Sequence, residues 1–453
     1  MSDAFTITDE QQDYSLYDLN ANPFPYSPVP DENPEIYCGQ QHVSDQISST
    51  VSSMLATGKS KHLVVTGKYG NGKSHTLKYT RSLLRDREDV VVGYVAQPGE
   101  GFLDIYHEFV YDLSFNRLQE IAYAYLASVS RDITEANPMG ADAMKSLLDE
   151  GDVLLSNIVP EAIRRLSDVT KFADFARAMV HMVYEDTNLY AWQWLTAEGI
   201  RYEQRKEMEI HSALDDDTMG VRAFTAFKNM LLDLGYTGVF VFVDEFESIA
   251  RLTPKNEQAT LNSIRHLMDQ NSSGLSILFG CAPEVWQDVM SEYHAFSERI
   301  GQEVSLRPLT SEHLYELVEN YLDRERPSTV ERSIQPFTEE SLDLIHQRSQ
   351  GNVRQVLALC SRILDDAANE DRSEITVDFV EDSIYVSSSL ESFPTHKKFL
   401  ISEKLCIPYI ADVVHLAIVH FSFLVVEQLV SSYVNRTKSP CSLKTQYQPK
   451  LLL

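Results

Sequence analysis

The chain has 453 residues, of which 67 are acidic and 39 are basic, so its formal net charge is −28. Its apolar share of 43% and aromatic share of 10% are enough for sizeable cores, which excludes a wholly disordered chain. The acidic balance argues against broad, non-specific attraction to nucleic acids or anionic membranes. At roughly 100–200 residues per domain, the length indicates two to four domains.

The cysteine spacing and the N-terminal residues indicate the cellular compartment of the protein. No two cysteines are spaced as CxxC and their number is odd, which argues against a disulfide framework or a structural zinc site. The first residues are acidic and polar, without the apolar run of a signal peptide. We therefore expect a cytoplasmic protein with no membrane partner.

The first ninety-five residues contain the clearest pattern in the chain. Residues 1–35 hold five prolines and few periodic apolar positions, which predicts an extended N-terminal arm. A helix pattern follows at about 41–57. His62–Thr66 and Val90–Val95 are short apolar runs typical of buried parallel strands, and the helix-like Ser74–Arg85 lies between them. Strand, turn, helix and strand in this order predict the start of a parallel α/β sheet.

The middle of the chain is helical by pattern. Apolar residues recur at helical spacing in four segments: Phe102–Leu126, Asp142–Leu155, Phe172–Tyr184 and Arg222–Leu234. Buried-strand runs return at Val239–Val243 and Leu275–Phe279, with a helix-like segment at Thr260–Met268 between them and a short strand expected at Val304–Leu306. From about residue 310 to 387 the pattern is helical again, which predicts a small helical bundle.

The turn after the first strand matches the phosphate-binding pattern GxxxxGK[ST] in full, over Gly67–Ser74. Its glycines let backbone N–H groups point at phosphate oxygens, and the start of the following helix adds its positive dipole end. Lys73 is expected to reach the β- and γ-phosphates of ATP, and the Ser74 hydroxyl to ligate Mg²⁺. The predicted nucleotide-binding residues are Gly67, Lys68, Tyr69, Gly70, Asn71, Gly72, Lys73, Ser74 and His75.

A second acidic element follows the strand Val239–Val243. Asp244 and Glu245 come directly after it, and ligands of open α/β sheets bind at this end of parallel strands. We expect Asp244 to hold Mg²⁺ through water and Glu245 to orient or deprotonate the attacking water. A solvated acidic turn is the alternative.

These motifs, with the helical segment after the sheet, resemble the AAA+ ATPases. The sequence is most similar to the branch that holds the origin-recognition ATPases and the ATP-binding proteins of BREX-type phage-defence loci. The stretches that carry the resemblance lie within about residues 20–390: Asn22–Phe24, Tyr37–Gln41, Pro98–Tyr106, Ala191–Glu198 and Leu234–Gly238.

The resemblance implies two further arginines. Arg299, in Ser297–Ile300, lies where the family places an arginine finger, and Arg354, in Gly351–Arg354, resembles the sensor-2 arginine. Both would act catalytically, by stabilising charge near the γ-phosphate; the alternative for each is a surface arginine paired with an acidic neighbour. The chain departs from the family at Cys281, where a polar sensor-1 residue is common, so hydrolysis could be slow.

The resemblance also sets the expected organisation. It implies an α/β fold: a parallel-sheet P-loop NTPase core of the AAA+ type with a large helical insertion, followed by a small helical lid. We expect an arm at 1–35, the nucleotide-binding domain at 36–308 with its insertion at about 105–230, the lid at 309–390, and a tail at 391–453. The aromatic residues of the insertion are expected in a core. The tail is basic relative to the body and could be a divergent or incomplete winged-helix-like segment.

The sequence therefore predicts a Mg²⁺-dependent ATPase of the AAA+ type that couples its nucleotide state to a DNA-associated assembly. The alternative is a slowly hydrolysing, nucleotide-gated switch or scaffold that recruits a protein partner; a replication initiator is a third reading. We expect a protein partner or a homo-oligomer, and the sequence alone does not establish a DNA contact.

Overall fold

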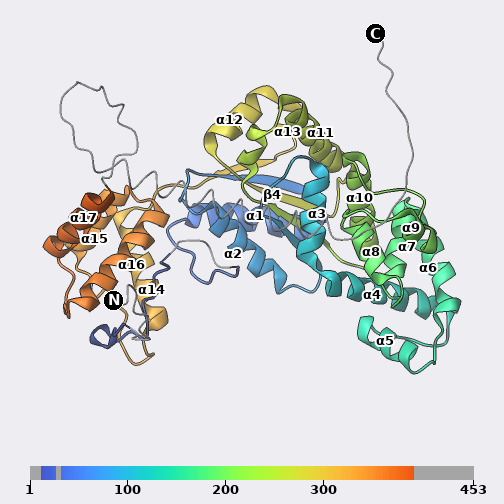
Figure 1. Ribbon diagram of the computed structural model, residues 1–453, viewed down its shortest axis with the longest axis horizontal. Helices are drawn as coiled ribbons and strands as arrows, with labels where there is room; N and C mark the ends of the chain where they lie inside the picture. Colours follow the sequence, from blue (N-terminus) through green and yellow to red (C-terminus); the bar gives the residue numbers. More distant parts are fainter. Residues whose placement is uncertain (1–11, 27–31, 392–453) are drawn as a thin grey trace, which may run out of the picture. The chain divides into compact units, whose positions relative to one another are not determined.

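The computed structural model describes residues 12–26 and 32–391 (Figure 1). The expectations for the tail at 391–453 lie almost entirely outside this part. None of the helices in the described ranges is long and apolar enough to cross a membrane.

Five parallel strands form one sheet, in the order β2-β3-β4-β1-β5. The strands are β1 (Lys61–Thr66), β2 (Val90–Val95), β3 (Gly238–Val243), β4 (Leu275–Cys281) and β5 (Gln302–Ser305). The parallel α/β fold expected from the sequence is confirmed. Four of the strands are almost wholly buried, which explains why they read as continuous apolar runs.

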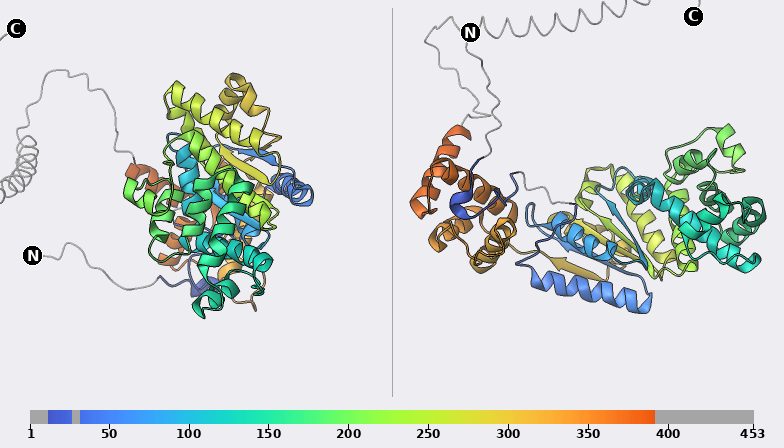
Figure 2. Two further views of the ribbon diagram at one scale, coloured as in Figure 1. Left: turned by 90° about the vertical axis from the view of Figure 1, so that its right-hand side faces the viewer. Right: turned by 90° about the horizontal axis from the view of Figure 1, so that it is seen from below.

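Helices cover both faces of the sheet (Figures 1 and 2). Leu63 and Val65 of β1 face a core shared with α1 (Gln41–Thr57) and α2 (Lys73–Arg85). Val64, between them, belongs to the opposite core, which is built with the helices that follow β2. The period-two alternation of a strand thus divides one apolar run between two layers of helices.

The residues between β2 and β3 form a helical region with no strand. Its helices are α3 (Phe102–Leu113), α4 (Phe115–Ile133), α5 (Ala141–Asp149), α6 (Leu155–Thr170), α7 (Ala173–His181), α8 (Asn188–Leu195), α9 (Tyr202–Glu207) and α10 (Asp217–Asp233). We refer to these helices as the insertion. Trp194 is buried there and donates a hydrogen bond to the Ser212 carbonyl at 3.0 Å, so this aromatic residue belongs to a core, as expected.

Two helices expected from periodicity are divided in the structure. The pattern at Phe102–Leu126 breaks at Ser114, whose backbone has φ of 73° and whose side chain accepts a hydrogen bond from the N–H of Arg117. Ser114 therefore ends α3 and caps α4. The pattern at Asp142–Leu155 likewise ends with α5 at Asp149, before α6 begins at Leu155.

The elements after β3 lead to a helical bundle, which we call the lid. The first are η2 (Phe246–Arg251), α11 (Pro254–Gln270), α12 (Pro283–Glu292) and α13 (His294–Ser297). The lid contains α14 (Ser311–Glu325), α15 (Glu339–Ser349), α16 (Val353–Asn369) and α17 (Val377–Glu391).

The described part of the N-terminal arm contributes to the core of the lid (Figure 2). It contains one turn of 3₁₀ helix, η1 (Ser15–Tyr17). Tyr17 and Phe24 are buried against lid residues, and the Tyr17 hydroxyl donates to the carbonyl of Arg372 at 2.6 Å. Buried aromatic side chains therefore anchor a segment whose prolines predicted only an extended arm.

Candidate nucleotide-binding site

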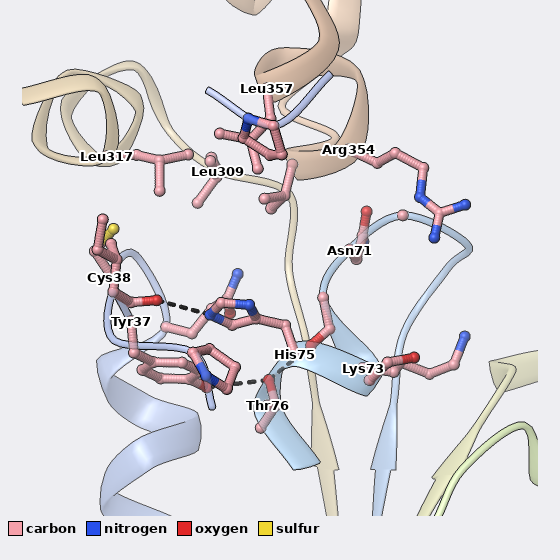
Figure 3. Close-up of a pocket in the computed structure, with 18 of the residues that line it drawn as sticks. Tyr37, Cys38, Asn71, Lys73, His75, Thr76, Leu309, Leu317, Arg354 and Leu357 are labelled. Atoms are coloured by element: carbon pink, nitrogen blue, oxygen red, sulfur yellow. Dashed lines mark hydrogen bonds between the residues drawn. The ribbon is translucent and has the colours of Figure 1, made fainter. Parts of the chain in front are cut away.

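A cavity of about 410 Å³ opens where β1 and β3 end (Figure 3). Its walls come from five places: the turn after β1, the residues after β3, the segments 22–25 and 34–40, and the lid. Because the carboxyl ends of parallel strands meet at one edge of a sheet, residues far apart in sequence line the same space.

The turn Gly67–Ser74, which we call the P-loop, has the backbone that its sequence requires. Gly70 and Gly72 have φ of 83° and 93°, in a backbone region that residues other than glycine rarely adopt. Helix α2 begins directly afterwards at Lys73, so its N-terminal end, which carries the positive end of the helix dipole, lies at the cavity. The predicted residues Tyr69 to His75 line the cavity, whereas Gly67 and Lys68 do not.

The Lys73 side chain is buried and already has two partners. Its Nζ donates to the Gly67 carbonyl at 3.0 Å and lies 3.3 Å from Oε1 of Glu247. The second contact was not expected from the sequence. An acidic residue three positions after Asp244 was the only signal that could have found it.

The two predicted carboxylates after β3 have different surroundings. Asp244 is buried, and its carboxylate accepts hydrogen bonds from the Tyr94 hydroxyl at 2.7 Å and from its neighbour's N–H at 2.9 Å. Glu245 is exposed and has a φ of 45°, in the left-handed region. Strained backbone of this kind clusters at functional sites. Both residues line the cavity.

Tyr94 connects Asp244 to a buried ion pair. Burial, and then the charge of Asp244, raise the pKa of the Tyr94 hydroxyl above its already high ordinary value, and this hydroxyl donates to the Asp244 carboxylate. The Arg81 guanidinium lies over the Tyr94 ring, 5.1 Å from its centroid, and also pairs with Asp112. Helices α2 and α3 thereby support the end of β3.

The other end of the cavity is aromatic and apolar. The Tyr37 and His75 rings are stacked with 6.1 Å between centroids, and His75 Nε2 lies 2.7 Å from the Ile36 carbonyl oxygen. Burial raises the pKa of Tyr37 to about 12. Three leucines line this end from the lid side: Leu309, Leu317 and Leu357 (Figure 3). An apolar slot beside a P-loop suits a flat nucleobase.

The first turn of α16 contacts the P-loop directly. Asn352 Nδ2 donates to the Tyr69 carbonyl at 2.8 Å, and the Arg354 N–H donates to the Gly70 carbonyl at 3.1 Å. The Arg354 guanidinium lies over the Tyr69 ring and donates to its hydroxyl. A Cβ at Gly70 would overlap the Asn352 amide, so this glycine also permits the contact between P-loop and lid.

The structure does not bring Arg299 to the cavity. Its guanidinium pairs with Asp269 at 2.9 Å and with Glu298 at 3.3 Å, and it is absent from the cavity walls. Cys281, at the end of β4, is buried, and burial raises the pKa of its thiol to about 12. A neutral thiol there is a weak hydrogen-bonding group.

Comparison with known proteins identifies the family. The model of the BREX system ATP-binding protein BrxC/D matches residues 29–357. No curated protein matches the sequence significantly. Among solved structures, the Aeropyrum pernix ORC2 protein, in its ADPNP–ADP complexes, is 12% identical, with a TM-score of 0.42 over 80% of this chain and 72% of that one.

Two other solved structures give similar values. Cdc6p from Pyrobaculum aerophilum is 12% identical, with a TM-score of 0.42 over 84% of this chain and 74% of that one. The Holliday junction branch migration motor RuvB from Thermotoga maritima is 12% identical, with a TM-score of 0.36 over 81% of this chain and 73% of that one.

Proposed function

Because the chain belongs to the BREX system ATP-binding protein BrxC/D family, we propose that it hydrolyses ATP with Mg²⁺ and relays its nucleotide state to a DNA-associated assembly. One observation carries the hydrolytic part of this proposal. The P-loop, the carboxylates after β3 and the first turn of α16 line a single cavity, although they come from three distant parts of the chain.

The P-loop supplies the phosphate contacts in this proposal. Gly70 and Gly72 hold the backbone in a form that turns its N–H groups toward an anion, and the start of α2 adds its dipole. Lys73 reaches the β- and γ-phosphates. The apolar end beside Tyr37 and His75 receives the base.

The residues around the P-loop fit a magnesium ion. No group of three or more His, Cys, Asp or Glu in the described ranges could hold a metal alone. Mg²⁺ commonly uses one or two carboxylates together with substrate phosphates and water, and Ser74 and Asp244 both line the cavity. Ser74 and Asp244 are the proposed ligands, and the ion would neutralise charge on the phosphates.

Three further side chains have proposed catalytic roles. Glu245, exposed to the cavity, orients or deprotonates the attacking water. Arg354 leaves Tyr69 to meet phosphate charge and so couples the lid to the nucleotide. Arg299, which does not line its own cavity, acts on the nucleotide of a neighbouring copy of the chain.

The proposed domain organisation follows these roles. Residues 36–308 bind and hydrolyse the nucleotide, the insertion at about 105–230 and the tail at 391–453 contact partners, and the lid at 309–390 responds to nucleotide state. Because the chain carries a net charge of −28, DNA contact requires a local surface or a partner protein.

A slowly hydrolysing switch is the second candidate, and Cys281 favours it. A thiol at the end of β4 stabilises transition-state charge poorly, so ATP could be held long enough to recruit a protein. Single-turnover hydrolysis with and without DNA separates the two functions. Stimulation by DNA supports the coupled ATPase, and indifference to DNA supports the switch.

Two substitutions test the ATPase itself. Lys73→Ala should abolish ATP binding in calorimetry. Glu245→Gln should bind ATP but hydrolyse it roughly a hundredfold more slowly, the contribution of a positioned general base. The exposed Glu284 does not line the cavity, so Glu284→Gln is the matched control. Normal turnover by either cavity variant would refute the assignment. Light scattering with and without ATP then reports on assembly.

A further inference from the structure

In the part of the chain that the structure describes, Lys73 forms an ion pair with Glu247. Its Oε1 lies 3.3 Å from Lys73 Nζ, and the side chains are only 9% exposed for the lysine and 25% exposed for the glutamate. Glu247 lies in η2, three residues after the proposed metal ligand Asp244, and lines the same cavity.

A buried ammonium requires such a partner. Removing one member of a buried pair leaves an uncompensated charge, which is costly, whereas an exposed pair contributes little. Lys73 is buried in the P-loop, where the phosphate oxygens of a nucleotide would also accept hydrogen bonds from its ammonium group. Glu247 and the phosphates therefore compete for one cation.

The two neighbouring carboxylates have other surroundings. Asp244 accepts hydrogen bonds from Tyr94 and from the backbone of Glu245. Glu245 is exposed and left-handed in its backbone. Neither forms an ion pair with Lys73 in the described ranges.

The second oxygen of Glu247 ties this pair to the next strand. Oε2 accepts a hydrogen bond from the N–H of Ala282 at 3.1 Å, directly after Cys281 at the end of β4. Glu247 thus supplies a polar group at a strand end where the side chain itself is a neutral thiol. A carboxylate fixed at both oxygens is held in one orientation toward Lys73.

We infer that Glu247 is the resting-state partner of Lys73 and a positioning residue that sets how tightly the site holds nucleotide phosphates. This inference rests on the proposed function. On nucleotide binding the ammonium turns from Glu247 to the β-phosphate, and on release it returns. The cost of breaking the pair lowers the affinity for ATP and ADP, but not for AMP, which has no β-phosphate.

The test is calorimetric titration of the full chain with ATP, ADP and AMP in the presence of Mg²⁺. Glu247→Gln keeps an oxygen for the Ala282 N–H and removes the charge. It should bind ATP and ADP roughly tenfold more tightly, the effect of removing a partly buried competing charge, while AMP binding changes less than twofold. Glu284→Gln should leave all three affinities unchanged.

Each result has a defined meaning. Unchanged or weaker ADP binding by Glu247→Gln, or equal tightening for AMP, overturns the inference. Failure of the unaltered chain to bind ATP overturns the proposed function instead. If the variant does not fold, a crystal structure of the unaltered chain with ADP decides: Lys73 should leave Glu247 for the phosphates, and an intact 3.3 Å pair would overturn the inference.

Discussion

Tyr94 donates a hydrogen bond to Asp244 across neighbouring strands, with 2.7 Å between the hydroxyl and Oδ2. The two residues are brought together because β2 and β3 are parallel neighbours, with Val95 opposite Val243. The hydroxyl fixes the orientation of the carboxylate that we propose as a metal ligand. Supporting hydrogen bonds of this kind influence metal affinity strongly.

Tyr94→Phe should therefore raise the Mg²⁺ concentration required for half-maximal hydrolysis by roughly tenfold. The phenyl ring keeps the contact with Arg81, so the core should remain folded. The measurement is ATPase rate against Mg²⁺ concentration, with Tyr202→Phe on exposed helix α9 as the control. An identical Mg²⁺ dependence would mean that Asp244 needs no help from Tyr94.

The contact between Asn352 and the P-loop gives a second prediction. Asn352 has two roles: its Oδ1 caps α16 by accepting from the N–H of Gln355, and its Nδ2 donates to the Tyr69 carbonyl. Asn352→Asp keeps the cap acceptor but loses the donor and places a negative charge against a carbonyl. Helix stability should be kept, and ATP affinity should fall roughly tenfold because the charge opposes phosphate.

Asn352→Ala provides the comparison for this prediction. It removes both contacts, so it should lower the free energy of unfolding by about 1 kcal/mol, the usual contribution of a cap, while weakening ATP binding less than Asp does. Melting curves and calorimetry measure the two effects separately. Equal nucleotide affinities for the two variants would show that the contact with the P-loop has no electrostatic influence on the site.

The fold could be predicted from the sequence where neighbouring residues determine the structure. The P-loop is a contiguous pattern, and strands buried on both faces appear as apolar runs. Ser114 shows the limit, because the pattern at Phe102–Leu126 continues through the break without a glycine or proline. The contacts of Glu247 with Lys73, and of Asn352 with Tyr69, join residues that are distant in sequence, so only the three-dimensional structure shows them.

Arg299 gives a third prediction, on assembly. Its pair with Asp269 is partly exposed and contributes little to stability, so Arg299→Ala should fold normally. It should bind ATP within about twofold of the unaltered chain and hydrolyse it at least about tenfold more slowly, because arginine fingers act on the transition state. Mixing Arg299→Ala with Glu245→Gln should restore hydrolysis in part, since each supplies what the other lacks. Unchanged hydrolysis by Arg299→Ala would show that Arg299 forms a surface ion pair and has no catalytic role.

His62 gives a prediction for stability at low pH. It is buried in β1, where its Nδ1 accepts the N–H of Ile277, and burial lowers the pKa of the imidazole from 6.5 to about 4. Between these values the unfolded chain binds a proton that the folded chain does not, so stability falls as the pH decreases from about 6.5 toward 4. Between pH 7.5 and pH 5 the loss is about 2 kcal/mol.

His62→Gln removes this titration, so its melting temperature should decrease less over that range than that of the unaltered chain. His294→Gln, at an exposed site in α13, should follow the unaltered chain. If the melting temperatures of all three proteins decreased equally between pH 7.5 and pH 5, the pKa of His62 would be the same in the folded and unfolded chain.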